Sequence, residues 1–196
     1  MLEVTADPAG IAADWIAERL HRRRFGEMHL AVSGGSTPPA MFAALVQHRL
    51  DWSRLHIWQV DERCVPLDDE RRNARQLGPF HEVGAVVHLL PDEWPTRLDV
   101  VHLGLGDDGH TASWPPGDPV VQSLRPVEEV GPFNGTKRWT LTPPVINAAS
   151  HRMFLATGAS KAPVIRRLLG ADTSLPAAHA AKPYTIIADG PAASTR

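Results

Sequence analysis

Short apolar runs alternate with stretches of helical periodicity along most of the chain, and this alternation constrains the fold more than any other feature. Helical spacing of apolar residues predicts helices over residues 8–24, 38–48, 143–150 and 160–170. The apolar runs predict strands over residues 28–33, 55–60, 86–90, 98–105, 138–142, 152–157 and 184–189. Strands that alternate with helices are typical of an α/β protein whose mostly parallel sheet is covered by helices on both faces.

Length and charge limit the classes of protein that fit this chain. Its 196 residues, 43% of them hydrophobic, are enough for one domain with one core over residues 1–196. Twenty Lys and Arg against 22 Asp and Glu give a formal net charge of −2, which provides no general attraction for nucleic acid or an anionic membrane. The apolar runs are too short to span a bilayer. We therefore expect a small-molecule partner, and neither nucleic acid nor membrane.

The single cysteine and the N-terminal residues indicate the cellular compartment of the protein. The single cysteine, Cys64, cannot form an intramolecular disulfide, which favours a reducing compartment. The stretch MLEVTADPAG lacks the basic flank and apolar run of a signal peptide. Both observations predict a cytoplasmic protein.

Four polar clusters each follow directly on a predicted strand: SGGST, DER, GDDGHTAS and ATGASK. Because ligands of parallel sheets bind beyond the carboxyl ends of the strands, we expect the clusters to line one crevice. The proline-rich residues 113–133 are predicted to form a long irregular segment, and its length favours a functional loop or flap.

The stretch SGGSTPP, residues 33–39, has the composition of a phosphate site. Gly34 and Gly35 allow the backbone to approach a ligand closely, and Ser36 and Thr37 offer hydroxyl groups. The helix predicted to follow directs its free N–H groups to the same place. No Gly-Lys-Ser/Thr follows, so the stretch is not a Walker A loop. An ordinary strand–turn–helix with a Ser or Thr cap is the alternative.

Two further clusters carry cations beside predicted strand ends. Arg63 in DER is suited to bidentate contact with a phosphate or carboxylate, with Asp61 in an orienting role. A solvent-facing charge cluster is the alternative interpretation. Lys161 lies near the start of a predicted helix, where it opposes the macrodipole, a small cost unless an anion is bound there.

His110 differs from most of the ten histidines because it follows a glycine turn at a strand end, close to two aspartates. A neutral imidazole there can accept a proton from water, with Asp107 or Asp108 fixing its tautomer. The same three residues are also a possible metal site. No second His or Cys cluster stands at ligand spacing, so we expect no metal. Read alone, the stretch fits a base, a metal ligand or a cap.

Taken together, these stretches resemble the motifs of the 6-phosphogluconolactonase family, in the family's order and across most of the chain from residue 30 onward. The matching stretches are LAVSGGSTP, WQVDERCVPLDDERRNA, LGLGDDGHTASWPPG, RWTLTPPVINAASHRMFLATGASKA and YTIIADGPAAS. The first and third are also similar to glucosamine-6-phosphate deaminases, which share the fold. DER in place of the deaminases' Asp-Glu-Tyr, and TASWPPG after the shared Asp-Gly-His, favour the lactonase.

The resemblance implies a three-layer α/β/α fold of the deaminase/isomerase type with a mostly parallel, Rossmann-like sheet. It implies hydrolysis of 6-phospho-D-glucono-1,5-lactone to 6-phospho-D-gluconate in the oxidative pentose phosphate pathway. No metal or organic cofactor is implied, and we expect a monomer or weak homodimer. Carried over by position, His110 matches the general base, with Asp108 as its partner. The other matching site residues are Asp61, Arg63, Lys161 and the phosphate-loop residues Gly34, Gly35, Ser36 and Thr37.

The chain departs from the family pattern in three places. Only PDEWPTR joins the strands predicted at 86–90 and 98–105, where members usually have a helix. Arg72 stands where a serine is common, and Trp114-Pro115 replaces Leu-Phe. These changes bear on the rim of the site, the oligomer contacts and substrate preference. An amino-sugar phosphate deaminase and a non-enzymatic sugar-phosphate binding protein are the alternative functions.

Overall fold

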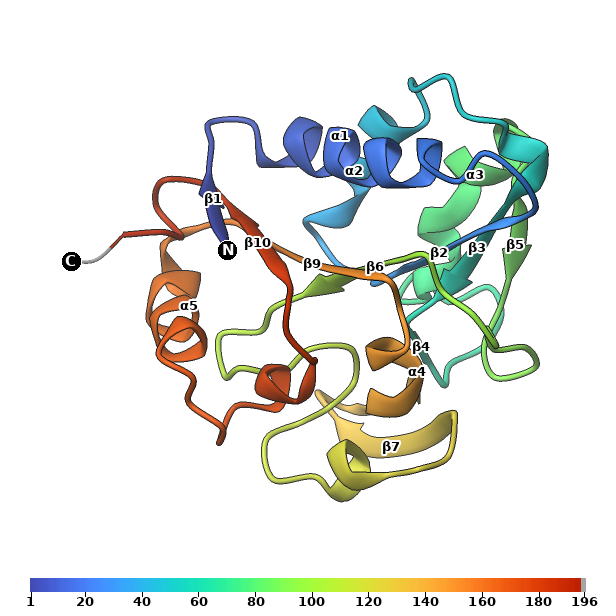
Figure 1. Cartoon of the computed structure of the whole chain (residues 1–196). Helices are drawn as coiled ribbons and strands as arrows, with labels where there is room; N and C mark the ends of the chain where they lie inside the picture. The colour runs from blue at the N-terminus through green and yellow to red at the C-terminus, as the bar shows by residue number, and fades with distance from the viewer. Residues whose placement is uncertain (195–196) are drawn as a thin grey trace.

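A seven-stranded sheet forms the middle layer of the computed structural model, which describes residues 1–194 (Figure 1). Its strands pair in parallel throughout, in the order β1-β10-β9-β6-β2-β3-β5. The strands are β1 (Leu2–Val4), β2 (Met28–Val32), β3 (Leu55–Gln59), β5 (Val86–His88), β6 (Val100–Gly104), β9 (His151–Ala156) and β10 (Thr185–Ala188). The parallel α/β arrangement predicted from the alternation is confirmed.

Helices cover both faces of this sheet. On one face lie α1 (Pro8–His21), α2 (Pro38–Leu45) and α3 (Gly78–Glu82), and on the other lie α4 (Pro143–Asn147) and α5 (Ala162–Leu169). Each has a proline in its first turn, where the missing N–H costs no intrahelical hydrogen bond. The connections include the 3-10 turns η1 (Trp52–Arg54), η2 (Asn73–Leu77), η3 (Pro119–Gln122), η4 (Ala159–Lys161) and η5 (Pro176–His179).

A second, antiparallel sheet of three strands extends one prediction and corrects another. Its order is β4 (Asp61–Arg63), β8 (Thr136–Leu141), β7 (Val127–Phe133). The DER stretch follows a strand, β3, as predicted, and it also forms the short strand β4. The segment 113–133, predicted to be irregular throughout, contains β7 and η3.

The sequence of β7, VEEVGPF, does not predict a strand. Two adjacent glutamates break the alternation of apolar and polar residues, and Gly131-Pro132 is typical of a turn. Contacts with the neighbouring strand β8 stabilise β7 as a strand. Lys137 Nζ lies 2.7 Å from Glu129 Oε1 across the two strands. Gly131 and Pro132 fall at a register shift between Val130 and Phe133, where the ladder is already interrupted.

Two apolar cores lie on the two faces of the parallel sheet. One joins α1 and α2 to the sheet, with the rings of Phe42 and Phe80 tilted against each other at 5.0 Å between centroids. The other lies beneath α5, α4 and the small sheet, and Trp114 is fully buried in it. The Trp114 indole donates to the Leu141 carbonyl at 2.8 Å. Trp114 therefore anchors its loop in the core and does not shape the rim of the site.

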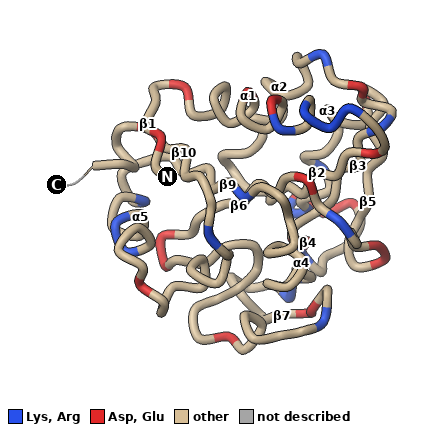
Figure 2. Tube along the Cα trace, viewed as in Figure 1, with Lys and Arg blue, Asp and Glu red and all other residues tan. Residues whose placement is uncertain are grey.

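Charged side chains of both signs are interspersed along most of the trace (Figure 2). The longest uninterrupted basic run, residues 22–24, follows α1. Across residues 1–194, no helix has the length and apolar character needed to cross a membrane.

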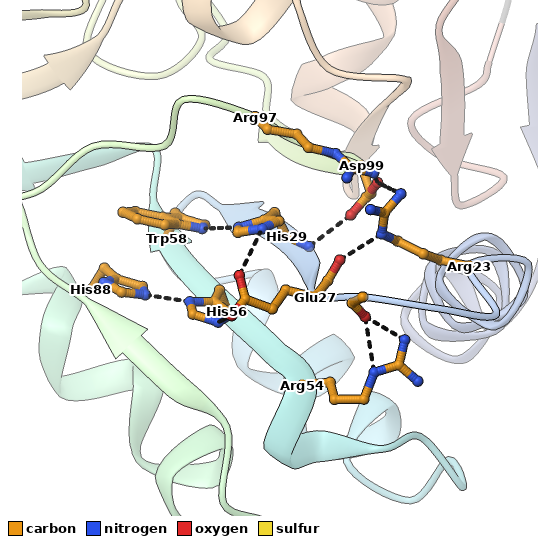
Figure 3. Close-up of polar contacts among 10 residues, drawn as sticks. Arg23, Glu27, His29, Arg54, His56, Trp58, His88, Arg97 and Asp99 are labelled. Atoms are coloured by element: carbon orange, nitrogen blue, oxygen red, sulfur yellow. Dashed lines mark hydrogen bonds and ion pairs between the residues drawn. The ribbon is translucent and has the colours of Figure 1, made fainter.

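The connection from β5 to β6 contains no helix, and a stack of aromatic rings lies over that edge of the sheet (Figure 3). Trp58 stacks on His88 with ring centroids 3.7 Å apart. The His56 ring is nearly parallel to that of His88 and lies beside it, at 5.0 Å between centroids. His56 Nδ1 lies 2.8 Å from His88 Nε2, and Glu93 pairs with the outer nitrogen of His88. Polar and ring contacts thus replace the apolar contacts of a packed helix here.

Candidate active site

A cleft of about 440 Å³ lies at the carboxyl ends of β2, β3, β6 and β9. The strand order places these ends side by side, so clusters far apart in sequence meet there. Eight of the sequence-predicted site residues line it: Gly34, Gly35, Ser36, Thr37, Asp61, Arg63, His110 and Lys161.

The loop at residues 34–37 joins β2 to α2, and all four of its residues line the cleft. Gly35 has φ of +132°, a conformation that favours glycine, and Gln76 fixes it by accepting from its N–H and donating to its carbonyl, both at 3.1 Å. Thr37 makes no side-chain cap bond, and its hydroxyl lies 3.3 Å from that of Thr157. Thr37 therefore lines the cleft and does not cap α2 with its hydroxyl, as the alternative of an ordinary capped turn would require.

His110 and Asp108 form a hydrogen-bonded pair after β6. His110 Nδ1 lies 2.6 Å from Asp108 Oδ1, which also accepts from the His110 backbone N–H at 3.1 Å. Partial burial opposes ionisation of Asp108, but these hydrogen bonds outweigh it and lower the pKa of the carboxyl. A carboxylate only accepts, so the shared proton resides on Nδ1 and Nε2 is left as the basic nitrogen.

The tight turn before His110 depends on two glycines. Gly106 donates its N–H to the His110 carbonyl at 2.8 Å, and the imidazole folds back over it. Gly109 has φ of +89°. A Cβ on Gly106 would collide with His110 and Asp108, and one on Gly109 would collide with Leu175. The G-D-D-G-H spacing therefore fixes where the imidazole lies.

The other aspartate of the pair has a different partner. Asp107 Oδ1 lies 2.5 Å from Lys161 Nζ, and the Ser160 hydroxyl donates to the same oxygen at 3.2 Å. The hydrogen bond from Lys161 lowers the pKa of Asp107. Neighbouring aspartates thus hold two different functional groups, Asp107 the ammonium and Asp108 the imidazole.

Asp61 lies in the cleft wall without a described contact to His110. Its Oδ2 accepts from the Ser113 hydroxyl at 2.7 Å and lies 3.9 Å from Arg138 Nη1. Burial raises the pKa of the Asp61 carboxyl. The geometry therefore pairs Asp108, and not Asp61, with the imidazole.

Glu62 is a structural residue of the site that the sequence reasoning missed. It is 1% exposed, and its carboxylate accepts from the backbone N–H groups of Arg63, Asn73 and Ala74 at 2.7–2.9 Å. Gln59 donates to it at 2.8 Å and Arg72 at 3.4 Å. Arg72 is therefore part of this buried network, which fastens residues 72–74 to β4.

Asn73 and Arg138 also line the cleft and were missed. Asn73 Nδ2 donates to the Asp61 carbonyl at 2.9 Å, and its side chain packs directly on Gly34. Arg138 lies on the same buried face of β8 as Thr140, two residues along the strand. A charged residue at a buried position of a strand was the available signal, but only the register of the small sheet shows that the position is buried.

Within residues 1–194, no group of three or more His, Cys, Asp or Glu side chains is arranged to hold a metal ion. The cleft instead presents one imidazole–carboxylate pair, the glycine-rich loop at residues 34–37 and three cationic side chains, Arg63, Arg138 and Lys161. Such a set can bind a phosphorylated molecule and remove a proton from water beside it.

The family model described as glucosamine-6-phosphate isomerases/6-phosphogluconolactonase matches residues 4–79 and 81–187. A 6-phosphogluconolactonase of Nostoc sp. strain PCC 7120 is 33% identical over 202 residues, covering 85% of this chain and 84% of that protein. One from Synechocystis sp. strain PCC 6803 is 34% identical over 175 residues, covering 74% and 70%.

Solved structures agree with this match. The 6-phosphogluconolactonase of Thermotoga maritima superposes with a TM-score of 0.81 at 25% identity, covering 96% of this chain and 97% of that one. A monomeric glucosamine-6-phosphate deaminase has a TM-score of 0.83 at 18% identity, covering 100% and 99%, and shows the shared fold alone. The chain belongs to the glucosamine-6-phosphate isomerase/6-phosphogluconolactonase family.

Proposed function

We propose that this protein hydrolyses 6-phospho-D-glucono-1,5-lactone to 6-phospho-D-gluconate, a reaction of the oxidative pentose phosphate pathway. The observation that carries the proposal is the His110–Asp108 pair, which faces the same cleft as the glycine-rich loop at residues 34–37. Relatives named 6-phosphogluconolactonase, at 33–34% identity over most of the chain, support it.

The phosphate of the substrate binds the loop at residues 34–37 at the start of α2. Lys161, held by Asp107, neutralises its charge at that end of the cleft, and Arg63 adds positive charge to the same cleft. Binding energy from this remote group positions the lactone ring beside His110, so that attack occurs within one complex rather than by chance encounter.

His110 Nε2 takes a proton from water as the water oxygen bonds to the lactone C1. The C1–ring oxygen bond then breaks, and the imidazolium returns the proton to the ring oxygen, which becomes a hydroxyl group. Asp108 holds the ring in the tautomer that leaves Nε2 free and stabilises the imidazolium. General base catalysis of this kind contributes about 10²- to 10⁴-fold to a rate.

The test is a comparison of two substrates with the purified protein. Fresh phosphogluconolactone should be consumed faster than its spontaneous hydrolysis, with release of acid, while glucosamine 6-phosphate should yield no ammonia. Ammonia release would instead identify a deaminase. Thermal stabilisation by sugar phosphates without any turnover would identify a binding protein.

Gly106→Ala is expected to lower kcat by about 10- to 100-fold, because small displacements of a catalytic group are costly. A Cβ on Gly106 would lie 2.0 Å from His110 Nδ1 and 2.6 Å from Asp108 Oδ1, so the pair must move. Steady-state kinetics with fresh lactone measure the effect.

The matched control is Gly78→Ala at the start of α3, where a Cβ meets no atom of the described chain within 4 Å. This variant should keep the wild-type kcat. Full activity in Gly106→Ala would contradict the assigned position of the imidazole.

A further inference from the structure

Arg138 is a buried cation in the cleft wall to which the mechanism above gives no task. It lies on β8, its side chain is 9% exposed, and its Nη1 is 3.9 Å from Asp61 Oδ2. Its Nε has no hydrogen-bond partner among residues 1–194. The guanidinium therefore has donors that the described chain does not use.

The local charges leave this cation poorly compensated. Asp61 is the only carboxylate described beside it, and that carboxylate is already bonded to Ser113 at 2.7 Å. Burial lowers the pKa of Arg138 and raises that of Asp61, as expected for charges that lose water without gaining a close ion pair. A buried guanidinium with free donors is well suited to a negatively charged oxygen from a ligand.

The order of the strands separates Arg138 from Lys161. Lys161 follows β9, His110 follows β6, and Arg138 lies on the small sheet, which continues from β3 through β4. From β9 to β3 there are three strand steps, or about 14 Å at the usual spacing. The two cations thus enter the cleft from opposite ends, with the imidazole between them.

Phe133 contacts both His110 and Arg138, so these two side chains lie on the same side of the cleft. The His110 ring meets Phe133 edge-on at 5.0 Å between centroids, and the Arg138 guanidinium carbon lies 5.1 Å from the centroid of the same ring. Arg63, the other arginine at this end, donates from Nη1 to the Arg71 carbonyl at 2.7 Å. Its Nε is also unpartnered among residues 1–194, but no described contact joins Arg63 to Phe133 or His110. Arg138 is therefore the cation with free donors that shares a neighbour with His110.

We propose that Arg138 is a further catalytic residue, whose guanidinium donates to the lactone carbonyl oxygen and stabilises the negative charge that forms there. The inference rests on the proposed lactonase function and names its oxyanion-stabilising group. When water bonds to C1, the carbonyl π electrons move onto this oxygen. They return as the C1–ring oxygen bond breaks, and Arg138 is unchanged at the end.

The test compares Arg138→Gln and Arg138→Lys with the wild-type protein on fresh phosphogluconolactone. Loss of one oxyanion donor typically costs about 10²- to 10³-fold in kcat, and we expect that loss in Arg138→Gln with KM changed less than about threefold. Arg138→Lys, which keeps the charge beside Asp61, should be intermediate. Added guanidinium ion should restore part of the activity of Arg138→Ala.

Arg125→Gln is the control, because Arg125 is an exposed arginine beside the same small sheet and lies outside the cleft. It should retain wild-type kinetics. A raised KM with unchanged kcat in Arg138→Gln would overturn the proposal in favour of ground-state binding. Lost activity in Arg138→Ala without guanidinium rescue would overturn it in favour of a structural role. An inactive wild-type protein would instead refute the lactonase function itself.

Discussion

Replacement of His110 by alanine is expected to lower kcat for the phosphorylated lactone by about 10²- to 10⁴-fold, with little change in KM. The imidazole faces the cleft, and the proposed phosphate site lies elsewhere, at the loop of residues 34–37 and Lys161. Loss of the base therefore removes stabilisation of the transition state and leaves ground-state binding intact. Initial rates above the spontaneous reaction measure both constants.

His81→Ala is the matched control, since His81 is an exposed histidine of α3 outside the cleft. Its kinetics should equal those of the wild type. Asp108→Asn should fall between the wild type and His110→Ala, because the amide weakens the hold on Nδ1. A His110→Ala protein with wild-type kcat would remove His110 from the mechanism.

Mild acid is expected to destabilise the fold, with the largest single contribution from His102 on β6. This histidine is fully buried, and neither ring nitrogen has a hydrogen-bond partner among residues 1–194. Burial lowers the pKa of His102 from 6.5 to about 3. Below pH 6.5 the unfolded chain takes up a proton that the folded chain refuses, so stability is lost as the pH falls toward 3.

The size of this effect follows from the shift. Between about pH 7.5 and pH 5, His102 alone should cost about 2 kcal/mol of unfolding free energy. Urea unfolding of the wild type and of His102→Leu at both pH values measures it. The leucine variant should lose about 2 kcal/mol less than the wild type over that interval.

Other groups titrate in the same range, so the comparison between variants is what isolates His102. Burial also lowers the pKa of His29 and His151, which contribute in the same direction, whereas the raised pKa of Asp61 acts in the opposite direction. These contributions are common to both proteins. Equal losses in the wild type and in His102→Leu would show that the buried imidazole is not the acid-sensitive group.

The parallel sheet could be predicted from the sequence because its strands are buried on both faces and are nearly continuous apolar runs, such as MHLAV in β2. The small sheet could not. β7 carries two glutamates, a glycine and a proline, which do not favour a strand locally. It is a strand because it pairs with β8, a contact that forms only in the folded chain. The helices α1 and α2 each end three residues before their predicted ends.

Site residues that follow a glycine turn at a strand end could be predicted, because parallel strands bring such turns to one edge. Partners that depend on distant contacts could not. Asp107 and Asp108 are adjacent in sequence, yet one binds Lys161 and the other His110. Asn73 and Arg138 enter the cleft through the Glu62 network and the register of β8, and neither is visible in local composition.

The most direct test of the account is the initial rate of acid release when the purified protein meets freshly prepared 6-phospho-D-glucono-1,5-lactone. We predict a saturable rate well above spontaneous hydrolysis, and a far smaller acceleration for the lactone without its phosphate, because the loop at residues 34–37 and Lys161 then have nothing to hold. A rate equal to the spontaneous one at every protein concentration would contradict the account.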